Sequence, residues 1–200
     1  MRKLIGTRIL CLLILAVSAF MIVNPVMAKR ISDPQPLIVI CIDSLTLQDI
    51  TGDRLPQLKH MFFQGAVALM NTNVAGTANL DSSYLTLGTG VRAKAVEVQP
   101  GYLAEDDFPT EAGTVAEVQQ RRTGNSTGAV LQPGIAALVA SNNGLGYIVQ
   151  PGVLGSALRE AGYTTAVIGC ADTDIPERPL VNFLMDTNGS VPFGYMGEGL

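Results

Sequence analysis

The feature that most constrains this chain is a continuous apolar run over 37–42, which ends directly in Asp43. A strand with one wet face alternates apolar and polar residues, so an unbroken run indicates a strand buried on both faces. A helix is predicted over 55–64, where Pro56 fits the first turn, and a second apolar segment follows over 66–70. This order predicts an α/β fold with a mostly parallel sheet and helices on both faces.

The sequence after residue 70 predicts further elements of the same α/β fold. Residues 71–90 are polar and small, which predicts a long loop after a buried strand, where α/β proteins place their chemistry. Residues 93–128 are typical of an insertion or a surface excursion. The other predicted elements are helices over 135–140 and 153–161 and strands over 164–170 and 181–185.

The N-terminus has the pattern of an export signal. Three basic residues within the first eight precede an apolar run over 9–23, and small residues over 26–28 suit a signal peptidase. The run is short for a membrane span, which needs about 20 residues. We therefore predict a cleaved signal peptide over 1–28, with an uncleaved anchor as the alternative, a linker over 29–36 and one domain over 37–200. The predicted location is outside the cytoplasm or in the cell envelope.

Charge and composition exclude some functions. Cleavage after residue 28 removes three positive charges and no acids, which changes the net charge from −4 to −7. Nucleic acid binding is not expected, because phosphate backbones need a basic face. The chain has a single histidine, His60, on the predicted first helix beside a lysine, where a surface position is expected. Metal chemistry would therefore depend on carboxylates.

Acidic residues follow three predicted strands, at Asp43, Asp172 and Asp186. The carboxyl ends of parallel strands meet at one sheet edge, where these carboxylates would converge and bind a hard or borderline cation. The alternative is that each aspartate makes a turn or caps a helix.

The polar loop supplies hydroxyl and amide groups. Thr77 and Ser82 are the candidate nucleophiles, since a metal nearby would lower the hydroxyl pKa. Local hydrogen bonding to the backbone is the alternative for each. Arg92 and Asn79 are the candidate substrate-binding residues. The guanidinium of Arg92 would pair with phosphate or sulfate oxygens. An isolated surface arginine is the alternative for Arg92.

These motifs, in this order, resemble the opening of the alkaline phosphatase superfamily of phosphodiesterases, sulfatases and phosphoglycerate mutases. The resemblance rests on the strand ending in Asp43, the Leu-Pro-Gln-Leu helix start at residue 55, the Leu-Gly-Thr-Gly motif at 87–90, and a helix, Ala-Gly-Tyr, strand unit over 154–170. It implies that this chain is the N-terminal part of such a catalytic domain.

The resemblance implies a role for particular residues. Asp43 matches the first ligand of a zinc-type two-metal centre, so the implied cofactor is a divalent metal, zinc or manganese. Counting back from the glycine motif places Leu80 or Ala78 at the nucleophile position, with Thr77 and Ser82 close by. The family's other ligands lie further along its chains.

Two functions follow from this interpretation. The first is an exported, metal-dependent hydrolase of phosphate or sulfate esters, with a small-molecule ester as its partner. The second is a cell-envelope scaffold or binding module that keeps the fold without the chemistry, which Leu80 and Ala78 favour. A likeness of fold does not decide between them.

Overall fold

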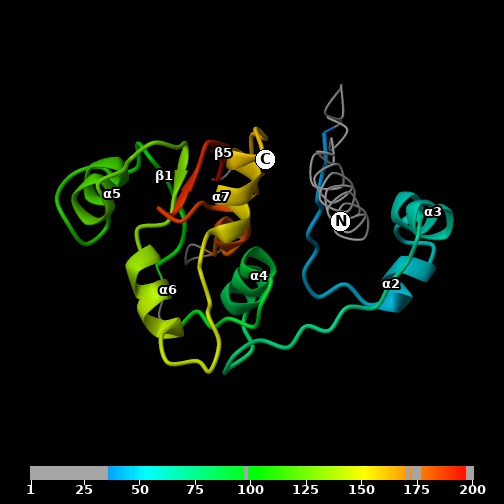
Figure 1. Ribbon diagram of the computed structural model, residues 1–200. Coiled ribbons are helices and arrows are strands. Elements are labelled where there is room, and N and C mark those ends of the chain that lie inside the picture. The colour runs from blue at the N-terminus through cyan, green and yellow to red at the C-terminus, as the bar shows by residue number, and fades with distance from the viewer. Residues whose placement is uncertain (1–35, 97–98, 170–171, 173–176, 197–200) are drawn as a thin grey trace, which may run out of the picture. The chain divides into compact units, whose positions relative to one another are not determined.

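A computed structural model of the protein describes residues 36–96, 99–169, 172 and 177–196 (Figure 1). The predicted signal peptide over 1–28 and the linker up to residue 35 lie outside these residues. The chain divides into two compact units, Met1–Val67 and Ala68–Leu200, which are described separately. None of the helices in the described ranges has the length and apolar character needed to span a membrane.

The described part of the first unit contains two short helices, α2 (Leu47–Thr51) and α3 (Pro56–Gln64). A capping box begins α2, in which the Thr46 hydroxyl accepts the Asp49 N–H and the Asp49 carboxylate accepts the Thr46 N–H. Pro56 occupies the first turn of α3, as predicted for a helix over 55–64.

The predicted buried strands over 37–42 and 66–70 are wrong. Both segments lie outside any strand, and their side chains are exposed: Leu37 is 88% exposed and Ile38 79%. A parallel strand that is buried on both faces needs strand neighbours and covering helices. The described part of this unit provides two helices and no strand, so the apolar run is left without a sheet.

The second unit contains two small sheets. Strands β1 (Tyr102–Leu103), β2 (Val130–Leu131) and β4 (Ser190–Val191) form an antiparallel sheet, and β3 (Ala166–Ile168) pairs in parallel with β5 (Phe193–Tyr195). The predicted mostly parallel sheet with helices on both faces is therefore wrong. Its first two strands do not form, and β3 alternates, with Val167 buried between two exposed neighbours.

Helices surround these sheets (Figure 1). They are α4 (Leu80–Thr89), α5 (Val115–Thr123), α6 (Ile135–Asn142), α7 (Val153–Glu160) and α8 (Val181–Leu184). The predicted helices over 135–140 and 153–161 are present as α6 and α7. The region over 93–128 is not merely a surface excursion, because Tyr102, Phe108, Val115 and Val118 form a second core with Leu131.

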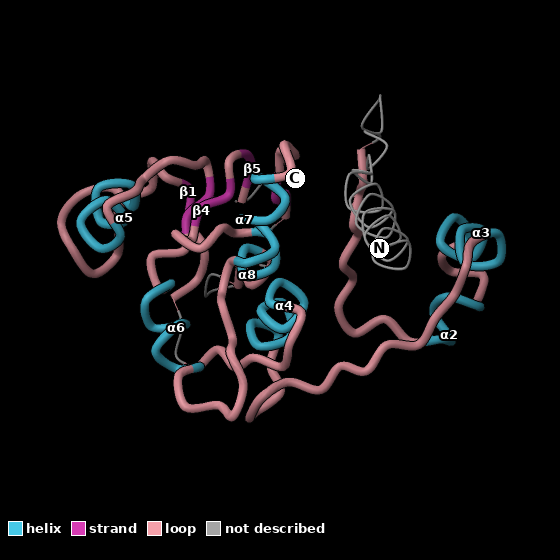
Figure 2. Tube along the Cα trace, in the orientation of Figure 1, coloured by secondary structure: helices cyan, strands magenta, loops and turns pink. Residues whose placement is uncertain are grey.

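The main core is formed by buried side chains from both halves of this unit, among them Leu85, Leu138, Met185 and Val191. Helix α8 lies between α4 and α7 and contacts both (Figure 2). Two glycines permit this approach. A Cβ at Gly88 would lie 2.7 Å from the Asn182 carbonyl oxygen, and one at Gly155 would lie 2.3 Å from the Met185 carbonyl oxygen. No side chain fits at either contact.

Two more predicted elements differ in the structure. The predicted loop over 71–90 contains α4, which Asn79 caps at its start and Gly90, with φ of 69°, ends in the left-handed region. The predicted strand over 181–185 is the short helix α8. A short and mostly apolar segment does not distinguish a strand from a buried turn of helix.

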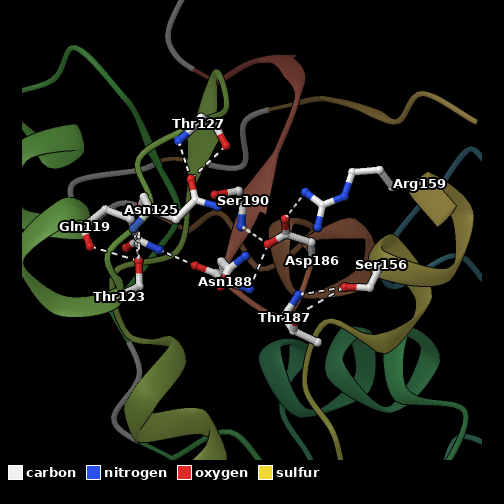
Figure 3. A network of polar contacts seen from close by, with 10 residues as sticks. All are labelled: Gln119, Thr123, Asn125, Thr127, Ser156, Arg159, Asp186, Thr187, Asn188 and Ser190. Atoms are coloured by element: carbon white, nitrogen blue, oxygen red, sulfur yellow. Dashed lines mark hydrogen bonds and ion pairs between the residues drawn. The ribbon is translucent and has the colours of Figure 1, made fainter.

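A polar network fixes the turn before β4 (Figure 3). The buried Asp186 carboxylate accepts the N–H groups of Asn188 at 2.8 Å and Ser190 at 3.0 Å, and an Arg159 guanidinium nitrogen lies 2.5 Å from its other oxygen. The Ser156 hydroxyl of α7 accepts the Thr187 N–H at 3.1 Å. These contacts attach the turn to α7.

Candidate functional site

The site begins at the N-terminus of α4, where Asn79 has two structural contacts. Its side-chain oxygen accepts the Ser82 N–H at 2.7 Å, which caps the helix. Its amide nitrogen donates to the Ala95 carbonyl at 3.1 Å. The predicted substrate-binding residue Asn79 thus has both ends of its amide in contact with this protein's own backbone.

Two hydroxyls on one face of α4 hold the next segment. The Ser82 hydroxyl accepts the Ala95 N–H at 2.9 Å, and the Thr86 hydroxyl accepts the Ala93 N–H at 3.0 Å. Residues four apart on a helix are separated by about 6 Å, close to the roughly 6.6 Å that two residues of extended chain span. Ser82 is fully buried. Its position favours a structural role and leaves Thr77 as the better candidate nucleophile.

The segment over 92–95 is also held from its other sides. Asn142 of α6 accepts the Lys94 N–H at 3.0 Å and donates to the Lys94 carbonyl at 2.8 Å. The Ala75 N–H donates to the Ala93 carbonyl at 3.0 Å, and the Tyr147 hydroxyl donates to the Arg92 carbonyl at 2.9 Å. The backbone that carries Arg92 and Lys94 is therefore fixed.

Side chains alternate along this segment. Ala93 and Ala95 are buried, Arg92 is exposed and Lys94 is half-buried. In extended chain, residues two apart share a face, so Arg92 and Lys94 both project outward. The Lys94 Cδ atom lies 3.9 Å from the position that a Cβ on Gly76 would occupy. Lys94 therefore packs beside the turn that carries the exposed Thr77.

An open cavity of about 490 Å³ adjoins Arg92. Its walls combine the amide side chains of Asn71 and Asn73 with apolar contacts from Leu87 and Val91. Pockets of this size hold small organic ligands, with a few polar groups that set orientation. The cavity, Arg92, Lys94 and Thr77 together are called the Thr77–Arg92 site.

The three aspartates predicted to converge have other surroundings. Asp43 is an exposed turn residue of the first unit, beside Ser44 with φ of 60°. The Asp172 carboxylate pairs with Arg178 at 2.8 Å, and Asp186 pairs with Arg159. Across residues 36–96, 99–169, 172 and 177–196, no three His, Cys, Asp or Glu side chains gather into a group able to hold a metal ion. The described residues therefore contain no complete two-metal centre.

Asp81, in the first turn of α4, has a raised pKa. Burial raises it above 3.8, and the negative charge of Glu177 adds to this, while the hydrogen bond from the Asn182 amide opposes it. Ionising Asp81 is therefore harder in the folded protein than in the unfolded chain.

We expect Asp81→Asn to change the pH dependence of stability. The contribution of Asp81 to wild-type stability is fully present below pH 3.8 and is lost as pH rises through the interval between 3.8 and the raised pKa. The variant does not titrate there. Urea unfolding at pH 3.5, 5 and 7 should show the variant gaining relative to wild type as pH rises. An Asp53→Asn control, whose carboxyl pKa is lowered by Lys59, should show no such gain.

Lys94 and Asn142 were not identified from the sequence. The signal for Lys94 is the alternation of charged and small residues over 92–95, which is typical of an extended segment with one buried face. Asn142 had no comparable signal, because its contact with Lys94 spans 48 positions of sequence.

Comparisons with known proteins found no matching family model, no similar curated protein and no similar solved structure.

Proposed function

We propose that this chain belongs to an exported hydrolase of phosphate or sulfate esters, with Thr77 as its nucleophile. The observation that carries the proposal is the exposed Thr77 hydroxyl on a turn beside Lys94 and two residues before the Asn79 cap of α4. The hydroxyls of Ser82 and Thr86 bond the backbone of residues 93 and 95, which supports Thr77 over both.

The reaction would proceed by covalent transfer. The Thr77 oxygen forms a bond to phosphorus or sulfur while the bond to the departing alcohol breaks, and the hydroxyl proton goes to that alcohol. Water then attacks the enzyme ester, which releases phosphate or sulfate and restores Thr77. Arg92 and Asn79 remain the proposed substrate-binding residues. Arg92 would contact the substrate through its guanidinium, and Asn79 would act by fixing the turn.

The proposed hydrolysis depends on a divalent metal ion. Asp43 is the proposed ligand for zinc or manganese, and the remaining ligands would lie outside the described residues. The complete product of the gene, stripped with a chelator and then reloaded, should recover turnover of an aryl phosphate or aryl sulfate. Asp43→Asn should abolish that recovery, and wild-type rates in this variant would contradict the assignment.

The central test replaces the nucleophile. Thr77→Ala in the complete gene product should lower turnover at least about a hundredfold, because the covalent step is lost. Thr77→Ser keeps a hydroxyl and should retain most of the activity. Thr72→Ala removes another exposed threonine of the same polar segment and should have no effect. Equal rates in Thr77→Ala and wild type would reject Thr77.

A scaffold or binding module is the second proposed function. It is supported by Leu80 and Ala78 at the positions where the resemblance places the nucleophile, and by the structural contacts of Asn79 and Ser82. Such a protein would bind no stoichiometric metal and would hydrolyse no ester. Metal analysis of the complete gene product, together with the turnover assay, separates the two functions.

A further inference from the structure

Two neighbouring cations in the second unit have no carboxylate partner among the described residues. The ion pairs among the described residues are formed by Lys59, Arg121, Arg122, Arg159 and Arg178, each with an aspartate or glutamate. Within the same described residues, no ion pair involves Arg92 or Lys94. This pair of cations is therefore available to an anion.

The backbone positions of Arg92 and Lys94 are fixed by the surrounding contacts. Their backbones are held by Asn142, Tyr147 and the hydroxyls of α4, and the spacing of two extended residues is about 6.6 Å. The Lys94 stem packs against the Gly76 turn, while its ammonium has no hydrogen bond within the described residues. A lysine arranged in this way keeps its stem on the protein and its charge in water.

We propose that Arg92 and Lys94 together bind a dianionic phosphate monoester, with its phosphate beside Lys94 and its organic group in the cavity next to Arg92. This inference rests on the proposed function, and it adds Lys94 to the site and chooses phosphate over sulfate. A phosphate monoester carries nearly two negative charges at pH 7, with a second pKa of about 6, whereas a sulfate ester carries one. Two cations match the dianion.

The discrimination is expected to be modest in size. One additional unit charge at about 4 Å in water contributes a factor of about five in affinity. The cavity itself does not distinguish the two esters, since it contacts the organic group through Leu87 and Val91. The preference for phosphate therefore depends on the second cation and should disappear when that cation is removed.

The experiment compares two probes of nearly the same shape, phenyl phosphate and phenyl sulfate. Their binding to the purified full chain is measured by calorimetry at pH 7.5 and constant ionic strength. Wild type should bind phenyl phosphate about fivefold more tightly. Lys94→Gln should weaken phenyl phosphate binding and bring the ratio to about one, and at pH 5 the ratio should also approach one in wild type. Lys59→Gln, at a half-buried lysine of α3 that pairs with Asp53, is the control and should leave the ratio unchanged.

Three outcomes would overturn the proposal: equal affinity for both probes in wild type, an unchanged ratio in Lys94→Gln, or the same loss in Lys59→Gln. Circular dichroism and the unfolding midpoint confirm that each variant is folded. The proposed function fails separately. If the complete gene product shows no turnover while phenyl phosphate binding still depends on Lys94, the hydrolase assignment falls and the binding site stands. If turnover depends on Thr77 but the ratio ignores Lys94, the reverse holds.

Discussion

Gly155→Ala is expected to lower the free energy of unfolding by about 3 kcal/mol. An alanine in a helix interior normally adds about 1 kcal/mol relative to glycine, so the expected sign is reversed. The reason is the contact between α7 and α8, where the new Cβ would lie 2.3 Å from the Met185 carbonyl oxygen and 2.4 Å from that of Leu184. Both are backbone atoms, which cannot rotate away, so the helices must separate and open the core.

Urea unfolding followed by far-UV circular dichroism measures this effect. Gly146→Ala is the matched control, because a Cβ at that glycine meets nothing within 4 Å, and its midpoint should stay near that of wild type. Gly88→Ala should resemble Gly155→Ala, since its Cβ would meet the carbonyls of Asn182 and Phe183 at 2.7 Å. A stabilised Gly155→Ala protein would show that α7 and α8 do not pack this closely.

Asp186→Ala is expected to cost about 2–4 kcal/mol, because two backbone N–H groups lose a charged acceptor. The Ser190 N–H is buried, so water cannot replace the carboxylate there without opening the turn. Arg159 is half exposed and regains solvent, which makes its share of the loss small.

A conservative variant isolates the acceptor from the charge. Asp186→Asn keeps one oxygen for the N–H groups of Asn188 and Ser190 (Figure 3), so its loss should be less than half that of the alanine variant. Arg159→Gln should lower stability by less than about 1 kcal/mol, as expected for an exposed ion pair. A large loss in Arg159→Gln with none in Asp186→Ala would contradict the role given to the turn.

The sequence predicted elements that carry their own local signals. Pro56 and Gly65 bound α3, and an apolar stripe with a closing Gly162 marks α7. The strands over 37–42 and 181–185 failed for a common reason. A mostly hydrophobic segment indicates a preference for burial and leaves open what the segment packs against. That information lies in distant partners, such as the glycines of α4 and α7 that accommodate α8.

The candidate site was predictable in part. The placement of a site in the polar segment after residue 70 stays a prediction, and the structure shows that Thr77 and Arg92 of this segment are exposed. The sequence predicts a loop in this segment because serine, threonine and asparagine side chains disfavour helix interiors. In α4 those groups are satisfied by Ala93 and Ala95 of the following segment, a tertiary contact that propensity does not contain.

The match between Ser82 and Thr86 on α4 and the two alanine N–H groups also limits how this gene can vary. One residue inserted between the two hydroxyls would turn the second by about 100° around the helix axis, and only one of the two bonds would survive. Length changes between Asn79 and Gly90 should therefore be rare among natural variants.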